Sequence, residues 1–397
     1  MANSNRELIG IAGQSALGTA IGTGSNNFVQ VHSSAGSFSA SETFTAINDN
    51  GRRGNNDAMD YEQYYGKGST DISWDGAIEL TNGTIKRGSV IGVLLRNLFG
   101  TGTPATGATN AAEASALFAT SMRDYSFRLG TANEYLTVVQ KFLGETSTNA
   151  KQIKDCKVTS LTITADTESV LSYSTTLMGQ PASTGTNGVG ITISDASFQD
   201  VLVDASTFNS GQVSAGTGTG GVSSGVLDGL VLPNYAGTAT SLVSSANIIS
   251  VEWSFSREAT PVYTMTGDGA STFKDIYTGP LEVTTSIVFY MDNAIAQMFR
   301  NKQANAYGAV QTAWQKGVAT QATERAFGIG ANKVSFAEGP MEIDTSASYT
   351  TLALSGRALY SNAVPLISGS AYTAGTPVEV RITENSLADA ANLHTYI

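Results

Sequence analysis

The chain repeatedly alternates apolar and polar side chains, which is the pattern of a β-strand with one buried face. In residues 71–80 the apolar face is formed by Ile72, Trp74, Ile78 and Leu80, and the polar face by Asp71, Ser73, Asp75 and Glu79. Residues 249–256 alternate in the same way, and weaker alternation occurs at 159–165, 281–290 and 378–382. The pattern predicts a protein that is mostly β.

A few short segments have the spacing of helices instead. Ser89 is a suitable N-cap for a helix with one apolar stripe, and Gly100 stands where a left-handed C-cap residue is needed. A second helix is predicted to begin at Asp292, and residues 305–316 are predicted to form a further one. The expected fold class is therefore all-β with short helices.

The two halves of the chain show the same order of features. A Ser-Phe-Ser strand, a turn rich in Gly and Asp, a Tyr before a Gly, an alternating strand and a short helix occur in 37–99 and again in 254–301. In this comparison Tyr64-Tyr65-Gly66 corresponds to Ile276-Tyr277-Thr278-Gly279. Chance similarity between two antiparallel domains is the alternative. A duplication predicts two β-sandwich or barrel domains with a flanking helix each, and three copies could then close a ring of six similar domains.

Changes in composition set the expected domain boundaries. Residues 1–27 are rich in Gly, Ser and Asn and are interpreted as an N-terminal arm, followed by a first β domain over 28–180. Residues 181–245 form a Gly/Ser/Thr-rich linker or surface insertion that cannot build a core alone. Within it we expect at most a short strand or two, near Ile191 and Val201. The second β domain is expected over 246–397.

Charge narrows the function classes. Charged residues make up 14% of the chain, against roughly 25% in an average soluble domain, which suits a surface covered by neighbouring copies and equally a secreted adhesin. The 33 acidic and 22 basic side chains give a formal charge of −11, the wrong sign for holding a phosphate backbone. An acidic surface can instead line a channel through which DNA slides, because like charges repel.

No segment of the sequence predicts export or membrane insertion. The first residues lack a basic segment followed by an apolar run, and no stretch approaches the roughly 18 apolar residues of a membrane span. The single cysteine, Cys156, excludes an intramolecular disulfide, and we expect a buried, inert thiol. These features favour a soluble protein made in a reducing cytoplasm, which counts against the adhesin.

No residue pattern predicts catalysis, a cofactor or a metal site. The two histidines, His32 and His394, are too few for a zinc site built on imidazole. The spacing Gly216, Gly218, Gly221 lacks the strand and helix that a nucleotide-binding motif needs. The segment 48–51 lacks the spaced carboxylates of a calcium loop and is better interpreted as a hairpin turn. We therefore expect a protein that is not an enzyme.

The acidic residues are the more informative polar side chains. Asp71, Asp75 and Glu79 share one face of their strand. A catalytic carboxylate pair would converge, with one member in an apolar pocket. A row along an open face is interpreted either as a solvated surface or as the lining of a channel. Glu282, in the alternating strand of the second half, is a fourth candidate lumen-facing residue.

Taken in order, these features resemble the tail tube (major tail) proteins of long-tailed bacteriophages. The resemblance is carried by the segments 13–19, 37–42, 51–54, 65–78, 94–100 and 157–163. It implies a β-sandwich tube fold with a packing helix, closed into rings whose inner strands surround a lumen. The length of the chain and the tract at 181–245 depart from compact members of the family, so ring stoichiometry and the role of this tract stay open.

The resemblance also implies a function and partners. The subunit would be a structural virion protein, assembled in the bacterial cytoplasm, whose stacked rings enclose the tape measure protein and later conduct double-stranded DNA without sequence-specific binding. Further implied partners are other copies of the chain and the tail terminator and initiator proteins, with no membrane. Long hairpins and arms would join the rings, which suits residues 1–27 and 45–68. The alternatives are a capsid or decoration protein and an extracellular β-rich adhesin.

Overall fold

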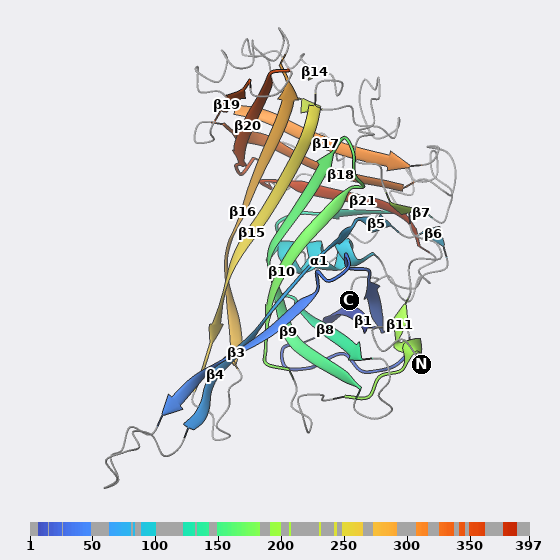
Figure 1. Ribbon diagram of the computed structural model, residues 1–397, viewed down its shortest axis with the longest axis vertical. Coiled ribbons are helices and arrows are strands. Elements are labelled where there is room, and N and C mark those ends of the chain that lie inside the picture. Colours follow the sequence, from blue (N-terminus) through green and yellow to red (C-terminus); the bar gives the residue numbers. More distant parts are fainter. Residues whose placement is uncertain are drawn as a thin grey trace.

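The computed structural model is built around one long antiparallel sheet (Figure 1). The structure describes residues 7–14, 16–25, 27–48, 63–80, 82–83, 89–100, 122–131, 133–142, 149–182, 191–199, 206–207, 230–231, 242–243, 248–264, 273–291, 307–316, 325–336, 341–345, 349–361 and 376–386. These residues are mostly strand, with one α-helix among them, which confirms the predicted all-β class.

The long sheet contains strands from both halves of the chain. In spatial order they are β3 (Ser39–Asn48), β4 (Gln63–Ala77), β10 (Ser172–Gly179), β9 (Ala150–Asp166), β15 (Ile248–Val262), β16 (Asp275–Tyr290), β20 (Thr351–Ala358) and β19 (Met341–Asp344), all antiparallel to their neighbours. At the seam between the halves, β9 pairs with β15 over 160–166 and 250–256. The predicted domains at 28–180 and 246–397 therefore share one hydrogen-bonded sheet.

Two smaller groups of strands cover one face of the long sheet. The first contains β11 (Phe198–Gln199), β2 (Phe28–Val31), β1 (Glu7–Gln14) and β8 (Tyr135–Phe142). Strand β8 pairs in turn with the first part of β9. The second contains β17 (Tyr307–Lys316), β18 (Arg325–Ser335), β21 (Glu379–Ser386) and β7 (Met122–Phe127). Its strands cross the long ones in Figure 1.

Three short pairings complete the described strands. Strand β6 (Asn82–Gly83) runs parallel to β21, β5 (Glu79–Leu80) pairs with β12 (Ser206–Thr207), and β13 (Leu230–Val231) pairs with β14 (Leu242–Val243). Near the predicted strand at Ile191, a single bridge joins that residue to Ala150. Strand β1 lies within the predicted N-terminal arm and pairs with β8 along its whole length.

The helix α1 (Val90–Phe99) begins and ends where the sequence predicts. Ser89 occupies the N-cap position, and Gly100 adopts a left-handed conformation with φ 63° while its N–H bonds to the Arg96 carbonyl. The predicted apolar stripe is part of a helix that is buried on every side. The reason is its location between the long sheet and the covering strands (Figure 1), where no face is left for water.

The core is formed by the inner side chains of the alternating strands. Trp74 and Trp253 are buried on the long sheet, and Trp314 is buried on β17. The indole N–H of Trp253 donates to Thr312 Oγ1 at 2.9 Å, and that of Trp74 donates to Tyr173 Oη at 3.0 Å. The indoles of Trp74 and Trp253 thus have partners, which avoids the cost of an unsatisfied donor.

The prediction of a helix over 305–316 is wrong, because this segment forms strand β17. Val310, Thr312 and Trp314 are all buried, which is the two-residue period of a strand. The spacing between Val310 and Trp314 fits one helical turn as well as two strand periods, and pairing with β18 selects the strand. The predicted helix from Asp292, the turn after Asn48, Val201, the 216–221 glycines and His394 lie outside the described residues.

The two halves repeat the same set of strand pairings in the same chain order. In the first half β3 pairs with β4, β4 with β10, β10 with β9, and β9 with β8. In the second half β15 pairs with β16, β16 with β20, β20 with β18 and β19, and β18 with β17. Strands β18 and β19 together take the place that the longer β9 has in the first half.

The first hairpin of each half has a β-bulge at the same place. Thr45 lies opposite Gly66 and Lys67, and Glu258 lies opposite Gly279 and Pro280. A Cβ atom added to Gly66 would lie 2.9 Å from the Thr45 carbonyl oxygen, and one added to Gly279 would lie 3.2 Å from Glu258 Cβ. Glycine therefore occupies the tight position of the bulge in both hairpins.

The second hairpin of each half also has a matching bulge. In the pair β8 and β9, Thr137 lies opposite Lys154 and Asp155. In the pair β17 and β18, Ala309 lies opposite 332 and 333. The first bulge is located by counting along β9 from its pairing with β10, and the second by counting along β18 from its pairing with β20. The two bulges fall at corresponding positions of the halves.

Candidate functional surface

The uncovered face of the long sheet, here called the hydroxyl face, carries twelve hydroxyl and four charged side chains. It is made of three cross-strand rows. They are Asp75, Ser174, Thr162, Ser254, Thr284 and Arg357; Ser73, Thr176, Ser160, Ser256 and Glu282; and Ser172, Thr164, Glu252, Ser286 and Ser355. All of these side chains are exposed or partly exposed. The rows cross the seam between the two halves without a break.

Strand geometry explains why hydroxyls gather on this face. The apolar residues of each strand turn to the core, so the intervening Ser and Thr residues turn to the other side. Neighbouring hydroxyls bond across the strands: Ser160 Oγ lies 2.7 Å from Thr176 Oγ1, and Ser355 Oγ donates to Ser286 Oγ at 3.2 Å. The face therefore offers a polar surface with few charges.

Three of the four predicted acidic residues lie exposed on the uncovered side of the long sheet. Asp71 and Asp75 lie on β4, and Glu282 lies on β16. Glu252 on β15 belongs to the same face and was missed by the sequence analysis, although it alternates with buried Val251 and Trp253. The carboxylates are spread over three strands, and none of the described Asp, Glu, His or Cys residues form a group that could hold a metal ion.

Glu79 behaves differently from the other three candidates. Strand β4 ends at Ala77, where Ile78 N–H bonds to the Leu171 carbonyl at 2.8 Å. Glu79 belongs to the short strand β5, and its carboxylate lies 2.7 Å from His32 Nδ1. Only 18% of its side chain is exposed. The histidine thus has a structural contact, and Glu79 stands apart from the row that the alternation predicts.

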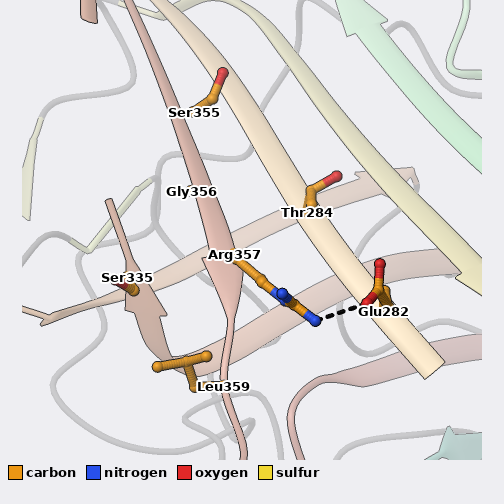
Figure 2. Close-up of a pocket in the computed structure, with 7 residues that line it drawn as sticks. All are labelled: Glu282, Thr284, Ser335, Ser355, Gly356, Arg357 and Leu359. Atoms are coloured by element: carbon orange, nitrogen blue, oxygen red, sulfur yellow. Dashed lines mark hydrogen bonds and ion pairs between the residues drawn. The ribbon is translucent and has the colours of Figure 1, made fainter. Parts of the chain in front are cut away.

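A shallow pocket of about 430 Å³ lies where β20 leaves β16 and turns toward β18 (Figure 2). Its lining residues are Glu282, Thr284, Ser335, Ser355, Gly356, Arg357 and Leu359. Arg357 reaches across from β20, and its Nη2 donates to Glu282 Oε1 at 2.7 Å. The two side chains are about half exposed, so water screens the pair and its contribution to stability is about 0–1 kcal/mol.

A second polar cluster is buried at the junction of α1, β8, β9 and β16. Lys157 is 3% exposed, and its ammonium group donates to the Glu134 carbonyl and lies 4.1 Å from the centre of the Tyr135 ring. Tyr135 in turn donates to Asp275 Oδ1 at 2.6 Å. Burial, with the nearby charge of Arg257, lowers the pKa of Lys157 to about 7.

Two arginines complete this cluster, and one of them joins the two halves of the chain. Arg257 of β15 donates to the Leu98 carbonyl at the end of α1, at 2.9 Å, and to the Gly279 carbonyl in the bulge of β16. Arg96 of α1 holds the Glu134 carboxylate with two hydrogen bonds. The Lys157 amine and the Tyr135 phenol are enclosed by protein. The cluster is therefore suited to fixing the hairpin of β15 and β16 rather than to binding a substrate.

Cys156 is buried beside this cluster, as the sequence predicts. Burial, and to a lesser extent the charge of Asp155, raises the pKa of its thiol above the ordinary value. The neutral thiol is therefore the stable form, and it is a weak nucleophile.

Comparison with known protein families and with curated proteins finds no match to this chain. None of the described helices is long and apolar enough to cross a bilayer. A functional assignment therefore rests on the geometry of the chain itself.

Proposed function

We propose that this protein is a structural subunit of a bacteriophage tail, which assembles into stacked rings that form the tail tube and conduct DNA. The observation that carries the proposal is the hydroxyl face, which runs across both halves of one sheet and is bordered by matching strands. A surface of this kind suits the inner wall of a closed barrel whose repeating unit is half a chain.

The repeated pairings and bulges support an internal duplication. Bulges interrupt a ladder at fixed places and are features that related structures keep. Two pairs of matching bulges, with Gly66 and Gly279 at one of them, are therefore better explained by duplication than by chance. Three copies of a duplicated subunit would present six similar units around an axis.

The charge of the hydroxyl face suits a conduit for DNA. Its acidic residues repel phosphates, and its hydroxyls bear no net charge. Arg357, the one basic residue in the three rows, is paired with Glu282 and so is not free to hold a phosphate group. DNA sliding over such a surface would meet few attractive charges along its path.

The width of the sheet is also compatible with a ring. Eight strands at a spacing of about 4.8 Å span about 38 Å, so three copies would give a circumference of about 115 Å. The corresponding diameter between opposite backbones is about 37 Å, and strand tilt would increase it. Such a lumen is wider than a DNA duplex.

Negative-stain electron microscopy of the purified chain over a range of concentrations tests this function. We expect rings or tubes with a central hole, and six lobes around it if three duplicated chains form each ring. Closed shells would favour a capsid protein instead. A chain that stays monomeric at every concentration and binds glycans would favour an adhesin.

A further inference from the structure

We propose that neighbouring subunits join through their outermost strands, with β19 of one copy pairing antiparallel to β3 of the next. This inference rests on the self-assembly proposed above, and it adds the two contacting edges and their register. The result would be one continuous sheet in which strand direction alternates through every copy.

The two strands lie at opposite edges of the long sheet. Among the described residues, β3 pairs only with β4, and β19 pairs only with β20. Each strand therefore has one edge that is not joined to another described strand, and the edge of a sheet readily pairs with a further chain. On β19 the side chain of Ile343 is 45% exposed, which is unusual for an isoleucine in a strand.

The seam inside the chain supplies a template for this contact. There, β9 of the first half pairs with β15 of the second half, with Ile163 opposite Trp253 and Thr164 opposite Glu252. If the halves are equivalent, the contact from one chain to the next should repeat the contact between the halves.

The bulges and pairings identify the residues of β19. Counted from the bulge glycines, Trp74 on β4 corresponds to Ile287 on β16, since each lies eight residues further on. Trp74 pairs with Thr175 on β10, and Thr175 pairs with Leu161 on β9. In the second half, Ile287 pairs with Leu354 on β20, and Leu354 pairs with Met341 on β19. Met341 therefore corresponds to Leu161, and three residues further on Asp344 corresponds to Thr164.

The same bulge identifies the residues of β3. Thr45 and Glu258 are the single residues opposite the bulges, so six residues earlier Ser39 corresponds to Glu252. Because Glu252 pairs with Thr164 at the seam, Ser39 of one copy should lie opposite Asp344 of its neighbour. By the same count, Ala40 should lie opposite Ile343.

Burial at the seam supports this assignment. Ile163 is 1% exposed and Trp253 is 0% exposed where β9 and β15 lie side by side. Ile343, which corresponds to Ile163, is 45% exposed. Pairing with β3 would place Ala40, which packs against the core of its own chain, beside Ile343 and remove this apolar side chain from water.

Disulfide cross-linking of the variant Ser39→Cys/Asp344→Cys tests the contact. Within one chain these two positions are separated by about seven strand spacings, or about 34 Å, which is far beyond the reach of a disulfide. Mild oxidation under assembly conditions should therefore give a ladder of covalent oligomers on a non-reducing gel. A mixture of the two single variants should give dimers only, because each chain then offers one edge.

The variant Thr43→Cys/Asp344→Cys is the matched register control. Thr43 lies on the same side of β3 as Ser39 but four residues away, or about 14 Å. We expect at least tenfold less cross-linking from this pair. Equal cross-linking by both pairs would overturn the proposed register.

Microscopy of the same samples separates this inference from the proposed function. Rings or tubes without the Ser39–Asp344 cross-link would overturn the edge contact while supporting a tube protein. Cross-linked chains that form neither rings nor tubes would support the contact and overturn the tube. The absence of both assemblies and cross-links would overturn both proposals.

Discussion

Lys157 is a residue whose surroundings strongly change its proton binding. Its pKa is about 7 in the folded chain and 10.5 as an ordinary lysine. Between these values the unfolded chain binds more protons, so this group makes the free energy of unfolding rise with pH, by up to about 1.4 kcal/mol per pH unit. Below about pH 7 the amine is protonated in both states, and its contribution is constant and least favourable.

Lys157→Met should remove this rise between about pH 7 and 9. Urea denaturation at several pH values, for the wild type and the variant, measures the difference in slope. Lys274→Met is the control, because that lysine is exposed and the slope should persist. Equal slopes for Lys157→Met and the wild type would contradict the assigned protonation.

Glu282 is expected to keep Arg357 from binding phosphate. Glu282→Gln removes the negative partner of the guanidinium, which should then attract the DNA backbone. We expect a threefold or larger increase in affinity for a short duplex at low salt, measured by fluorescence anisotropy, and a decrease as salt is added. The double variant Glu282→Gln/Arg357→Gln should return to the wild-type affinity. An unchanged affinity of Glu282→Gln would show that the ion pair has no such role.

At the scale of elements, the sequence predicts strands and helix limits where one period dominates. Residues 249–256 alternate over their whole length and form part of β15, and Ser89 and Gly100 bracket α1. The segment 305–316 was misassigned because its few large apolar residues fit two periods, and only the contact with β18 distinguishes them. The tertiary partner therefore decided what local spacing could not.

The same reasoning separates the predictable and unpredictable parts of the candidate surface. Alternation alone places Asp71 and Asp75 on one face of β4. It cannot place Glu79, because the strand ends before that residue, nor can it find the buried cluster around Lys157. The groups of that cluster come from Arg96 to Asp275 along the chain, and no local spacing relates them.

At the scale of the whole molecule, the seam predicts that the two halves unfold together. The ladder between β9 and β15 and the contacts of Arg257 cross from one half to the other, so neither half can lose its structure without exposing the other. Variants that keep only Trp74 or only Trp314, with the other tryptophans changed to Phe, report on separate halves. Their fluorescence should give transitions that coincide with the overall loss of circular dichroism within each variant. Two separate transitions in either variant would indicate independent domains.

The seam also bears on how a filament of these subunits would bend. Seven consecutive residue pairs lock β9 to β15, so the halves cannot hinge against each other. Curvature of a long filament would then have to arise between successive layers of subunits, whose contacts can open on one side and close on the other. Each layer would keep a round cross-section, and the passage would stay equally wide along a strongly curved path.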